Sequence, residues 1–175
     1  TKHHMEKIQQ SGLRNEEERF LTGKGAQSLV YEYTDPVTHK QLVRKEMRGI
    51  SNLDGGTIEQ VASDKKKVYE CLKKYIGEYL PETHYIISKN AAGFPKIQII
   101  QEKINGKTLK EKSNDNEWEP EDDEFRAMIM QSLADVFKDK SLESNLQAYR
   151  INEAFANPEN TMYDPITKKY WVVDW

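Results

Sequence analysis

Apolar and polar residues alternate along several short stretches in the first hundred residues. Residues 41–47 alternate as expected of a half-buried strand, and residues 29–33 have the β-branched and aromatic character of another. Residues 84–88 and 96–101 are two further strand-like runs, separated by the turn-forming stretch 90–93. The pattern therefore predicts four β-strands over these ranges.

Between the second and third of these strands, the apolar residues recur at the spacing of a helix. They are Ile58, Val61, Val68, Leu72 and Ile76. Pro81 follows, and proline cannot continue the hydrogen-bond ladder of a helix. We predict a helix over residues 57–79, preceded by a loop over residues 49–56.

The last third of the chain has a different pattern. Residues 111–123 are acidic and polar apart from Trp118, which predicts a linker or an exposed loop. A second helix is predicted from Pro120 or Glu121 to Phe137, with one apolar side made of Phe125, Met128, Ile129, Leu133 and Val136. Residues 142–149 favour a further short helix, and residues 170–173 favour a strand.

The order of these elements indicates an α+β fold, in which a small antiparallel sheet with one helix precedes a mainly helical part. We place an N-terminal lobe at residues 13–104 and a reduced or truncated C-terminal lobe at residues 105–175. A chain of 175 residues is long enough to bury a sizeable core.

Composition narrows the classes of partner. The chain is 37% hydrophobic and 31% charged, without the long apolar run of a membrane span. A net charge of −3 creates no strong field for nucleic acid or an anionic membrane, so we expect neither as a partner. Residues 1–12 lack the apolar stretch of a secretory signal. We expect a cytoplasmic protein, although an effector delivered into a host cell would share these features.

A glycine loop, residues 23–28, lies between two predicted strands. It reads Gly23-x-Gly25-x-x-Ser28 and leads into Val30. Dinucleotide and Walker loops open a helix instead, so the placement argues against both. A glycine loop that closes a hairpin can offer N–H groups to a triphosphate, and Lys45 on the next strand could reach phosphate oxygens. A plain tight turn and a surface lysine would leave the same pattern.

A carboxylate follows the last predicted strand. Burying Asp174 there is costly unless it has a partner or a metal ion. Asn160 lies fourteen residues earlier, after Asn157 and Pro158, and this distance accommodates a strand, a turn and a second strand. An ordinary hairpin with a solvated Asp174 is the alternative interpretation.

Taken together, the glycine loop, Lys45, the helix and this ending resemble the protein kinase-like superfamily, which includes bacterial small-molecule kinases and reduced effector kinases. The resemblance implies ATP and Mg²⁺ as ligands. It implies that Lys45 binds the α- and β-phosphates and that Asn160 and Asp174 hold Mg²⁺. Trp175 stands where protein kinases usually have phenylalanine.

The resemblance also assigns residues around the nucleotide. Residues 99–104 are similar to the hinge strand, where backbone groups around Glu102 to Ile104 would bond adenine while Val30 covers the ring. Gly23, Gly25 and Ser28 would cover the phosphates. Either Glu70 or Glu59 could pair with Lys45, and we favour Glu70.

The chain departs from the family at the residue that orients the attacking hydroxyl. The family has an aspartate shortly before the asparagine, but Phe155 occupies that spacing before Asn160. Glu153 takes the position if the loop is two residues longer, and it is our candidate base. A glutamate there would place its carboxylate differently, which can cost much rate.

Three functions follow. The first is a minimal ATP-dependent phosphotransferase with a protein or a small molecule as acceptor. The alternative is a catalytically weak or inactive pseudokinase that binds nucleotide or a partner. A third is an interaction domain without nucleotide.

Overall fold

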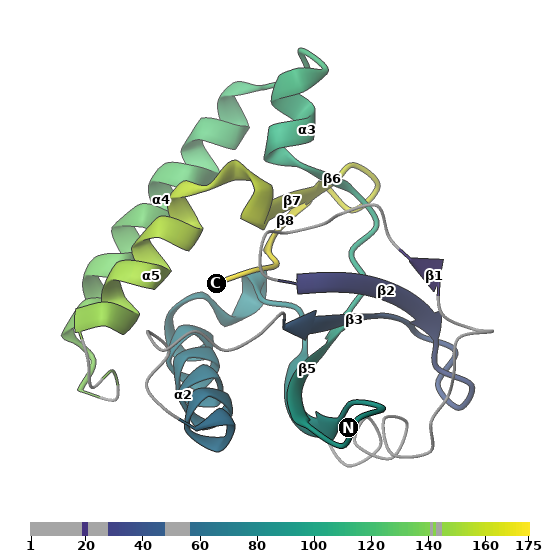
Figure 1. Cartoon of the computed structure of the whole chain (residues 1–175). Helices are drawn as coiled ribbons and strands as arrows, with labels where there is room; N and C mark the ends of the chain where they lie inside the picture. The colour runs from purple at the N-terminus through teal and green to yellow at the C-terminus, as the bar shows by residue number, and fades with distance from the viewer. Residues whose placement is uncertain (1–18, 21–27, 48–56, 141, 143–144) are drawn as a thin grey trace. The chain divides into compact units, whose positions relative to one another are not determined.

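The computed structural model describes residues 19–20, 28–47, 57–140, 142 and 145–175. The described residues fall into two compact units (Figure 1). Unit 1 draws on Thr1–Lys66 and Glu82–Lys103, and unit 2 on Lys67–Pro81 and Ile104–Trp175. Within the described ranges, no helix combines the length and the apolar character needed to cross a membrane.

Unit 1 contains an antiparallel sheet in the order β1-β2-β3-β5-β4 (Figure 1). Its strands are β1 (Arg19–Phe20), β2 (Ser28–Thr34), β3 (Gln41–Met47), β4 (Thr83–Lys89) and β5 (Pro95–Glu102). The four strands predicted from the sequence are confirmed as β2 to β5. The predicted turn between β4 and β5 contains Gly93, whose φ of 85° suits glycine.

Successive side chains along each strand point to opposite faces of the unit 1 sheet, and buried residues lie on both faces. One face carries the apolar cluster of Tyr33, Leu42, Ile86 and Ile100. The opposite face carries Val43 and Lys45, which lie on β3 two residues apart. The same period of two that predicts the strands thus decides which side chains share a face.

The helix predicted over residues 57–79 is confirmed as α2 (Ile58–Ile76), followed by the 3-10 turn η2 (Gly77–Tyr79). The unit boundary falls inside α2, after Lys66. In unit 2, Tyr79 packs edge-on against Phe125 with 5.1 Å between ring centroids. The predicted loop over residues 49–56 lies outside the described residues.

Unit 2 combines helices with a three-stranded antiparallel sheet in the order β6-β7-β8. Its helical elements are α3 (Leu109–Asn114), α4 (Pro120–Lys138), α5 (Asn145–Ala156) and the 3-10 turn η3 (Pro158–Asn160). Its strands are β6 (Lys107–Thr108), β7 (Thr161–Asp164) and β8 (Lys169–Val172). α4 and α5 lie side by side (Figure 1). This mixture of helices and antiparallel sheets is the predicted α+β class.

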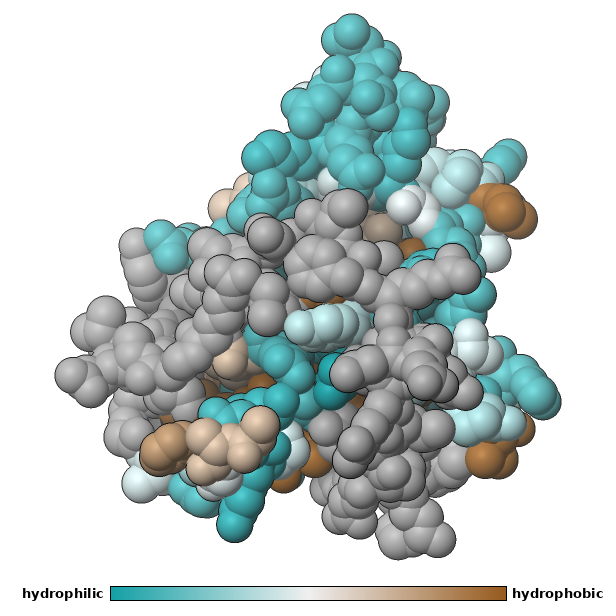
Figure 2. Space-filling view, turned by 45° about the vertical axis from the view of Figure 1, so that its right-hand side comes forward, coloured by the Kyte–Doolittle hydropathy of each residue, from teal (hydrophilic) through white to brown (hydrophobic). Residues whose placement is uncertain are grey.

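The prediction of a linker or an exposed loop over residues 111–123 is wrong in part. α3 occupies the start of this range, because Thr108 and Glu111 form a reciprocal capping box that satisfies two N–H groups at the helix start. Asp122 at the other end is fully buried. The connection between α3 and α4 is the non-helical part of this range, and it is exposed apart from the half-buried Trp118. Figure 2 shows hydrophilic residues gathered at the top of the view, where Figure 1 places this connection.

Two details of the predicted helices differ in the structure. Of the five apolar residues assigned to one side of α4, four are buried, but Met128 is 37% exposed and its sulfur accepts a hydrogen bond from Tyr79. The short helix predicted over residues 142–149 is instead α5, which continues to Ala156. Its later residues Ile151 and Phe155 are buried, and this i, i+4 pair extends the helix past the predicted end.

Candidate functional site

The β7–β8 hairpin of unit 2 brings two predicted site residues to neighbouring positions. Thr161 pairs with Val172 in the antiparallel register. One step further along, the N–H of Val173 donates to the carbonyl oxygen of Asn160 at 2.9 Å. Asp174 is the next residue after Val173. Of the predicted Mg²⁺ ligands, Asn160 is therefore the acceptor in this backbone hydrogen bond and Asp174 directly follows its donor.

The side chain of Asn160 is oriented by the end of α5. Its Nδ2 donates to the carbonyl oxygen of Ala154 at 2.9 Å, and its backbone N–H donates to the carbonyl oxygen of Asn157 at 3.0 Å. Since the amide nitrogen is used by the helix, Oδ1 is the atom that the half-buried side chain can offer to a cation.

Asp174 is exposed, and its Oδ1 accepts a hydrogen bond from the N–H of Trp175 at 2.9 Å. The indole ring of Trp175 stacks on Tyr69, with 5.6 Å between centroids and 11° between planes. Both rings belong to unit 2. This stacking holds the backbone directly after Asp174 against the C-terminal half of α2.

Two further contacts fix the turn between α5 and β7. Arg126 of α4 donates from Nη2 to the carbonyl oxygen of Ala156 at 2.6 Å, which places a cation at the negative end of α5. Lys110 of α3 pairs with Glu159 at 2.7 Å, and its hydrogen bond and charge lower the pKa of Glu159. The turn that leads to Asn160 is thus held from both α3 and α4.

A buried ion pair supports the same hairpin. Nζ of Lys112 lies 2.8 Å from Oδ2 of Asp122, and the two residues are only 5% and 0% exposed. The hydroxyl of Tyr170 in β8 donates to Oδ1 of Asp122 at 2.6 Å, and the N–H of Glu119 donates to Oδ2 at 2.9 Å. We call Lys112, Asp122 and Tyr170 the buried triad.

The pKa values of the triad reflect its burial and its contacts. Burial alone would raise the pKa of Asp122, but the hydrogen bonds from Lys112, Tyr170 and the backbone of Glu119 hold it below its ordinary value. Burial and the hydrogen bond to Asp122 both raise the pKa of Tyr170. The carboxylate is therefore charged and the phenol neutral near neutral pH.

In unit 1, the predicted phosphate-binding Lys45 is half-buried on β3, directly opposite Val30 of β2. Its Nζ donates to Oε1 of Gln101 on β5 at 3.1 Å. Val30 and Lys45 therefore share one face of the sheet, as the assignment of Val30 to the adenine ring and of Lys45 to the phosphates requires.

The predicted hinge strand, residues 99–104, covers the end of β5 and the two residues after it. The N–H of Glu102 donates to the carbonyl oxygen of Glu82 at 3.1 Å, and the N–H of Lys103 donates to the carbonyl oxygen of Gln41 at 3.0 Å. These two N–H groups are used within unit 1. Ile104 begins the next segment of unit 2, and its role toward adenine stays a prediction.

For the predicted lysine partner Glu70 and for the glycine loop, the proposed roles stay predictions. Glu70 is exposed on α2 and lies 4.0 Å from Lys73. Gly23 and Gly25 lie outside the described residues, and Ser28 begins β2.

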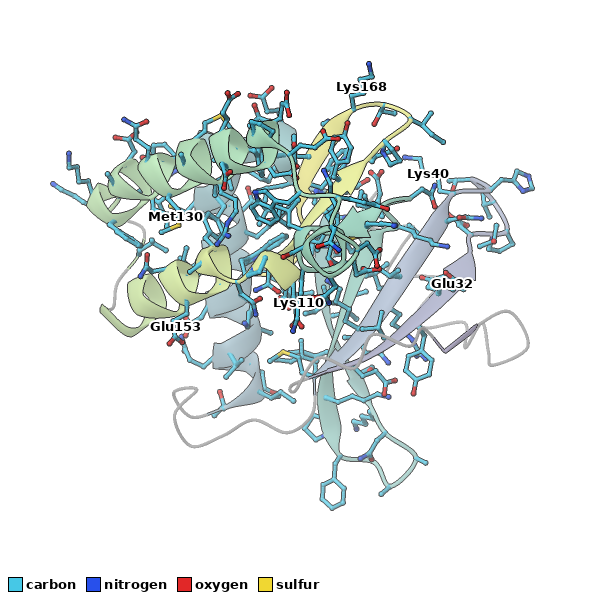
Figure 3. The ribbon with its side chains drawn as sticks, turned by 90° about the horizontal axis from the view of Figure 1, so that it is seen from above. Glu32, Lys40, Lys110, Met130, Glu153 and Lys168 are labelled. Carbon is cyan, nitrogen blue, oxygen red and sulfur yellow. The ribbon has the colours of Figure 1, made fainter. Side chains whose placement is uncertain are left out.

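The candidate base Glu153 is exposed on α5, and Figure 3 shows it on that helix. The segment assigned to a catalytic loop is helical as far as Ala156, so Glu153 belongs to a helix rather than to a loop. Phe155, at the spacing where the family has aspartate, is 4% exposed and fills the core of unit 2.

The sequence did not predict the buried hydrogen bonds of two polar residues, Gln101 and Asp122. Gln101 reads as an ordinary polar position of an alternating strand, and Asp122 reads as one of several acids in a solvated stretch. By contrast, the extent of α5 could have been found from the sequence, because the i, i+4 spacing of the apolar residues Ile151 and Phe155 continues the helical pattern.

In the part of the chain that the structure describes, no group of three or more His, Cys, Asp or Glu residues could hold a metal ion. The predicted Mg²⁺ ligands are a smaller set, one amide and one carboxylate. No protein-family model matches the chain, and no curated protein matches it either.

Proposed function

We propose that this protein is a minimal, kinase-like phosphotransferase that uses ATP and Mg²⁺. The observation that carries the proposal is that Asn160 and Asp174 lie just before β7 and just after β8, where the N–H of Val173 donates to the carbonyl oxygen of Asn160. An amide oxygen and a carboxylate at neighbouring positions are oxygen ligands of the kind that Mg²⁺ prefers.

The residues present fit a magnesium ion by their chemistry. The use of Asn160 Nδ2 by Ala154 leaves Oδ1 as the donor atom, and the carboxylate of Asp174 is solvent-accessible. When bound, the ion would supply positive charge that offsets the charge of the phosphates. Asn160 and Asp174 would hold it, and the turn fixed by Arg126 and Lys110 would keep Asn160 in place.

The proposal assigns the phosphates and the adenine ring to separate residues. Lys45 supplies an ammonium to the α- and β-phosphates, and Val30 on the same face covers adenine. The glycine loop, with Gly23, Gly25 and Ser28, covers the phosphates, and the backbone around Glu102 and Ile104 recognises the adenine ring.

A second candidate is a pseudokinase that binds nucleotide without transferring phosphate. One observation favours it: α5 continues to Ala156, so that Phe155 is buried and Glu153 lies on a helix. No carboxylate then stands at the family's spacing before Asn160. A substrate hydroxyl would lose the residue that orients it, while the groups that bind nucleotide would remain.

A thermal-shift measurement with ATP and Mg²⁺ tests the binding that both candidates share. A ligand that binds only the folded state raises the Tm, by an amount that grows with ligand concentration. We expect the rise in the native chain and its loss in Lys45→Ala and in Asp174→Asn. Asp164→Asn, in the turn of the same hairpin, is the matched control and should keep the rise. No rise in the native chain at millimolar ATP would contradict both candidates.

Transfer of labelled phosphate separates the two candidates. A phosphotransferase incorporates label into itself or an acceptor, or hydrolyses ATP, and loses this activity in Asp174→Asn. Reduction in Glu153→Gln would assign the base. Nucleotide binding without any turnover would support the pseudokinase.

A further inference from the structure

A chain of buried polar side chains crosses three strands of unit 1. Nζ of Lys45 on β3 donates to Oε1 of Gln101 on β5 at 3.1 Å. Nε2 of Gln101 donates in turn to Oγ1 of Thr83 on β4 at 2.9 Å. Gln101 is 2% exposed and Thr83 is 3% exposed. A buried glutamine in a sheet core is costly unless both ends of its amide are satisfied, and here both are.

The strand register explains why these three side chains meet. Gln101 is directly opposite Val43 on one side and Thr83 on the other, so all three side chains share a face. Lys45 lies two residues beyond Val43 and reaches Gln101 diagonally, a distance that long side chains span.

The amide of Gln101 can take only one orientation in this chain. Rotating it by half a turn would aim the Nε2 hydrogens at the ammonium of Lys45, which has only donors. Thr83 secures the other end by accepting from Nε2. The carbonyl oxygen of Gln101 is therefore held toward Lys45 by hydrogen bonding rather than by packing alone.

We propose that Gln101, oriented by Thr83, is a positioning residue that aims the ammonium of Lys45 toward an anionic ligand. An amide oxygen fixes the direction of the ammonium without adding a negative charge, whereas a carboxylate in its place would compete with the phosphates for that charge. The inference deepens the proposed function, on which its nucleotide part rests. The relay itself is a property of unit 1 and is testable without nucleotide.

Glu32 and Tyr85 also lie on this face. Glu32 of β2 (Figure 3) and Lys103, after β5, form their own ion pair at 2.7 Å. Tyr85 of β4 is buried opposite Ile99, which is itself opposite Lys45. Substitutions at Gln101 leave all of these groups in place.

The test is the pH profile of Lys45 acylation by acetic anhydride, read by mass spectrometry of the peptide that contains Lys45. Only the uncharged amine reacts. In Gln101→Met, the ammonium loses an acceptor, and the midpoint of the profile falls. In Gln101→Glu, a carboxylate favours the ammonium, and the midpoint rises by about one to three pH units. The rate at a fixed pH below the midpoint then falls at least about tenfold.

Gln98→Met is the matched control. Gln98 is a buried glutamine on the same strand, 1% exposed, but it lies on the opposite face and its amide donates to Glu46. Its substitution should leave the Lys45 midpoint unchanged. Thr83→Val, which frees the amide of Gln101, should shift the midpoint in the same direction as Gln101→Met but less.

Shifts of opposite sign at one position show that residue 101 acts directly on the ammonium, because a loss of packing alone would move both Gln101 variants the same way. Equal shifts in the two variants, or a Gln101→Met midpoint equal to that of Gln98→Met, would overturn the inference. Circular dichroism and thermal melting establish that each variant is folded. If Gln101→Glu does not fold, the comparison of Gln101→Met with Gln98→Met decides alone.

The same labelling separates this inference from the proposed function. MgATP should slow acylation of Lys45 in the native chain, and the protection should weaken in both Gln101 variants. Absence of protection, with the midpoints shifted as described, would refute nucleotide binding at Lys45 and leave the relay standing. Protection with unshifted midpoints would support nucleotide binding and refute the relay.

Discussion

Each unit of this protein holds a lysine ammonium against a buried oxygen, but the two oxygens differ in charge. In unit 2, Lys112 meets the carboxylate of Asp122, and both are almost fully buried. In unit 1, Lys45 meets the amide oxygen of Gln101. The first contact cancels the charge of its lysine and suits a supporting role. The second directs the ammonium without supplying an opposite charge, which suits a group that binds an anion.

The largest expected effect comes from breaking the charged contact. Lys112→Met strands the carboxylate of Asp122 in the core, with only Tyr170 and the N–H of Glu119 left as donors. Removing one partner of a buried ion pair typically costs about 3–5 kcal/mol. We expect a loss of this size in the free energy of unfolding, measured by urea denaturation.

The control for this loss is the double variant Lys112→Met with Asp122→Leu. Replacing both charges by apolar groups should recover much of the lost stability, because no isolated charge remains buried. A double variant no more stable than Lys112→Met would show that packing, rather than charge, accounts for the loss.

The corresponding substitution in unit 1 should cost less. Lys45→Met leaves a neutral acceptor on Gln101 without this donor, and an unsatisfied polar group typically costs about 1–3 kcal/mol. The same urea measurement gives the comparison directly. A loss as large as that of Lys112→Met would contradict the contrast between a supporting and a ligand-binding lysine.

The contact between Lys112 and Asp122 should make stability depend on pH, whereas the contact between Lys45 and Gln101 contains no carboxylate. The expected change in the free energy of unfolding is smaller than that of the substitutions above. The pKa of Asp122 in the folded chain lies below its ordinary value of 3.8. Its stabilising contribution is therefore present above about pH 4 and is lost as the pH falls through the lower, folded-state value. The free energy of unfolding, measured from pH 6 downward, should show this loss in the native chain. The loss should be smaller in the double variant Lys112→Met/Asp122→Leu, which has no carboxylate at this position.

Tyr170 adds a loss at the alkaline end. Its pKa in the folded chain is raised above its ordinary value of 10.0. The contribution of its neutral form is complete below about pH 10 and is lost as the pH rises further, since the unfolded chain then releases the proton more readily. Tyr170→Phe should remove this alkaline dependence, while Gln101→Met in unit 1 should not.

The strands of unit 1 could be predicted from the sequence because short runs of β-branched and aromatic residues are separated there by turn-forming stretches. The alternation along β3 is imperfect, since the adjacent Leu42 and Val43 are both buried, but once the strand is assigned its period of two places Val43 and Lys45 on one face. The partner of Lys45 could not be predicted in the same way. Which residue of β5 reaches Lys45 depends on the register between strands, and the sequence of β3 contains no information on that register.

The packing of unit 2 was harder to predict because a buried carboxylate lies within an acidic stretch that reads as solvent-exposed. Asp122 lies among other acids, and such a stretch is usually solvated, yet its contact with Lys112 ten residues earlier buries it. The end of α5 could have been predicted, since Ile151 and Phe155 continue its apolar side. The spacing between Asn160 and Asp174 predicted a strand, a turn and a second strand, and β7 and β8 occupy that interval; the role of the two residues toward Mg²⁺ stays a prediction.

Asn160 contacts two elements at once, because its Nδ2 donates to Ala154 in the last turn of α5 while its carbonyl oxygen accepts from the N–H of Val173, directly after the end of β8. A cation drawn to Oδ1 would polarise the whole amide and strengthen the bond from Nδ2 to Ala154. Binding of the cation would then stabilise the end of α5 through the side chain of Asn160. The amide hydrogens near the end of α5 should exchange with solvent more slowly when that cation is bound, which makes this helix end a reporter of the site.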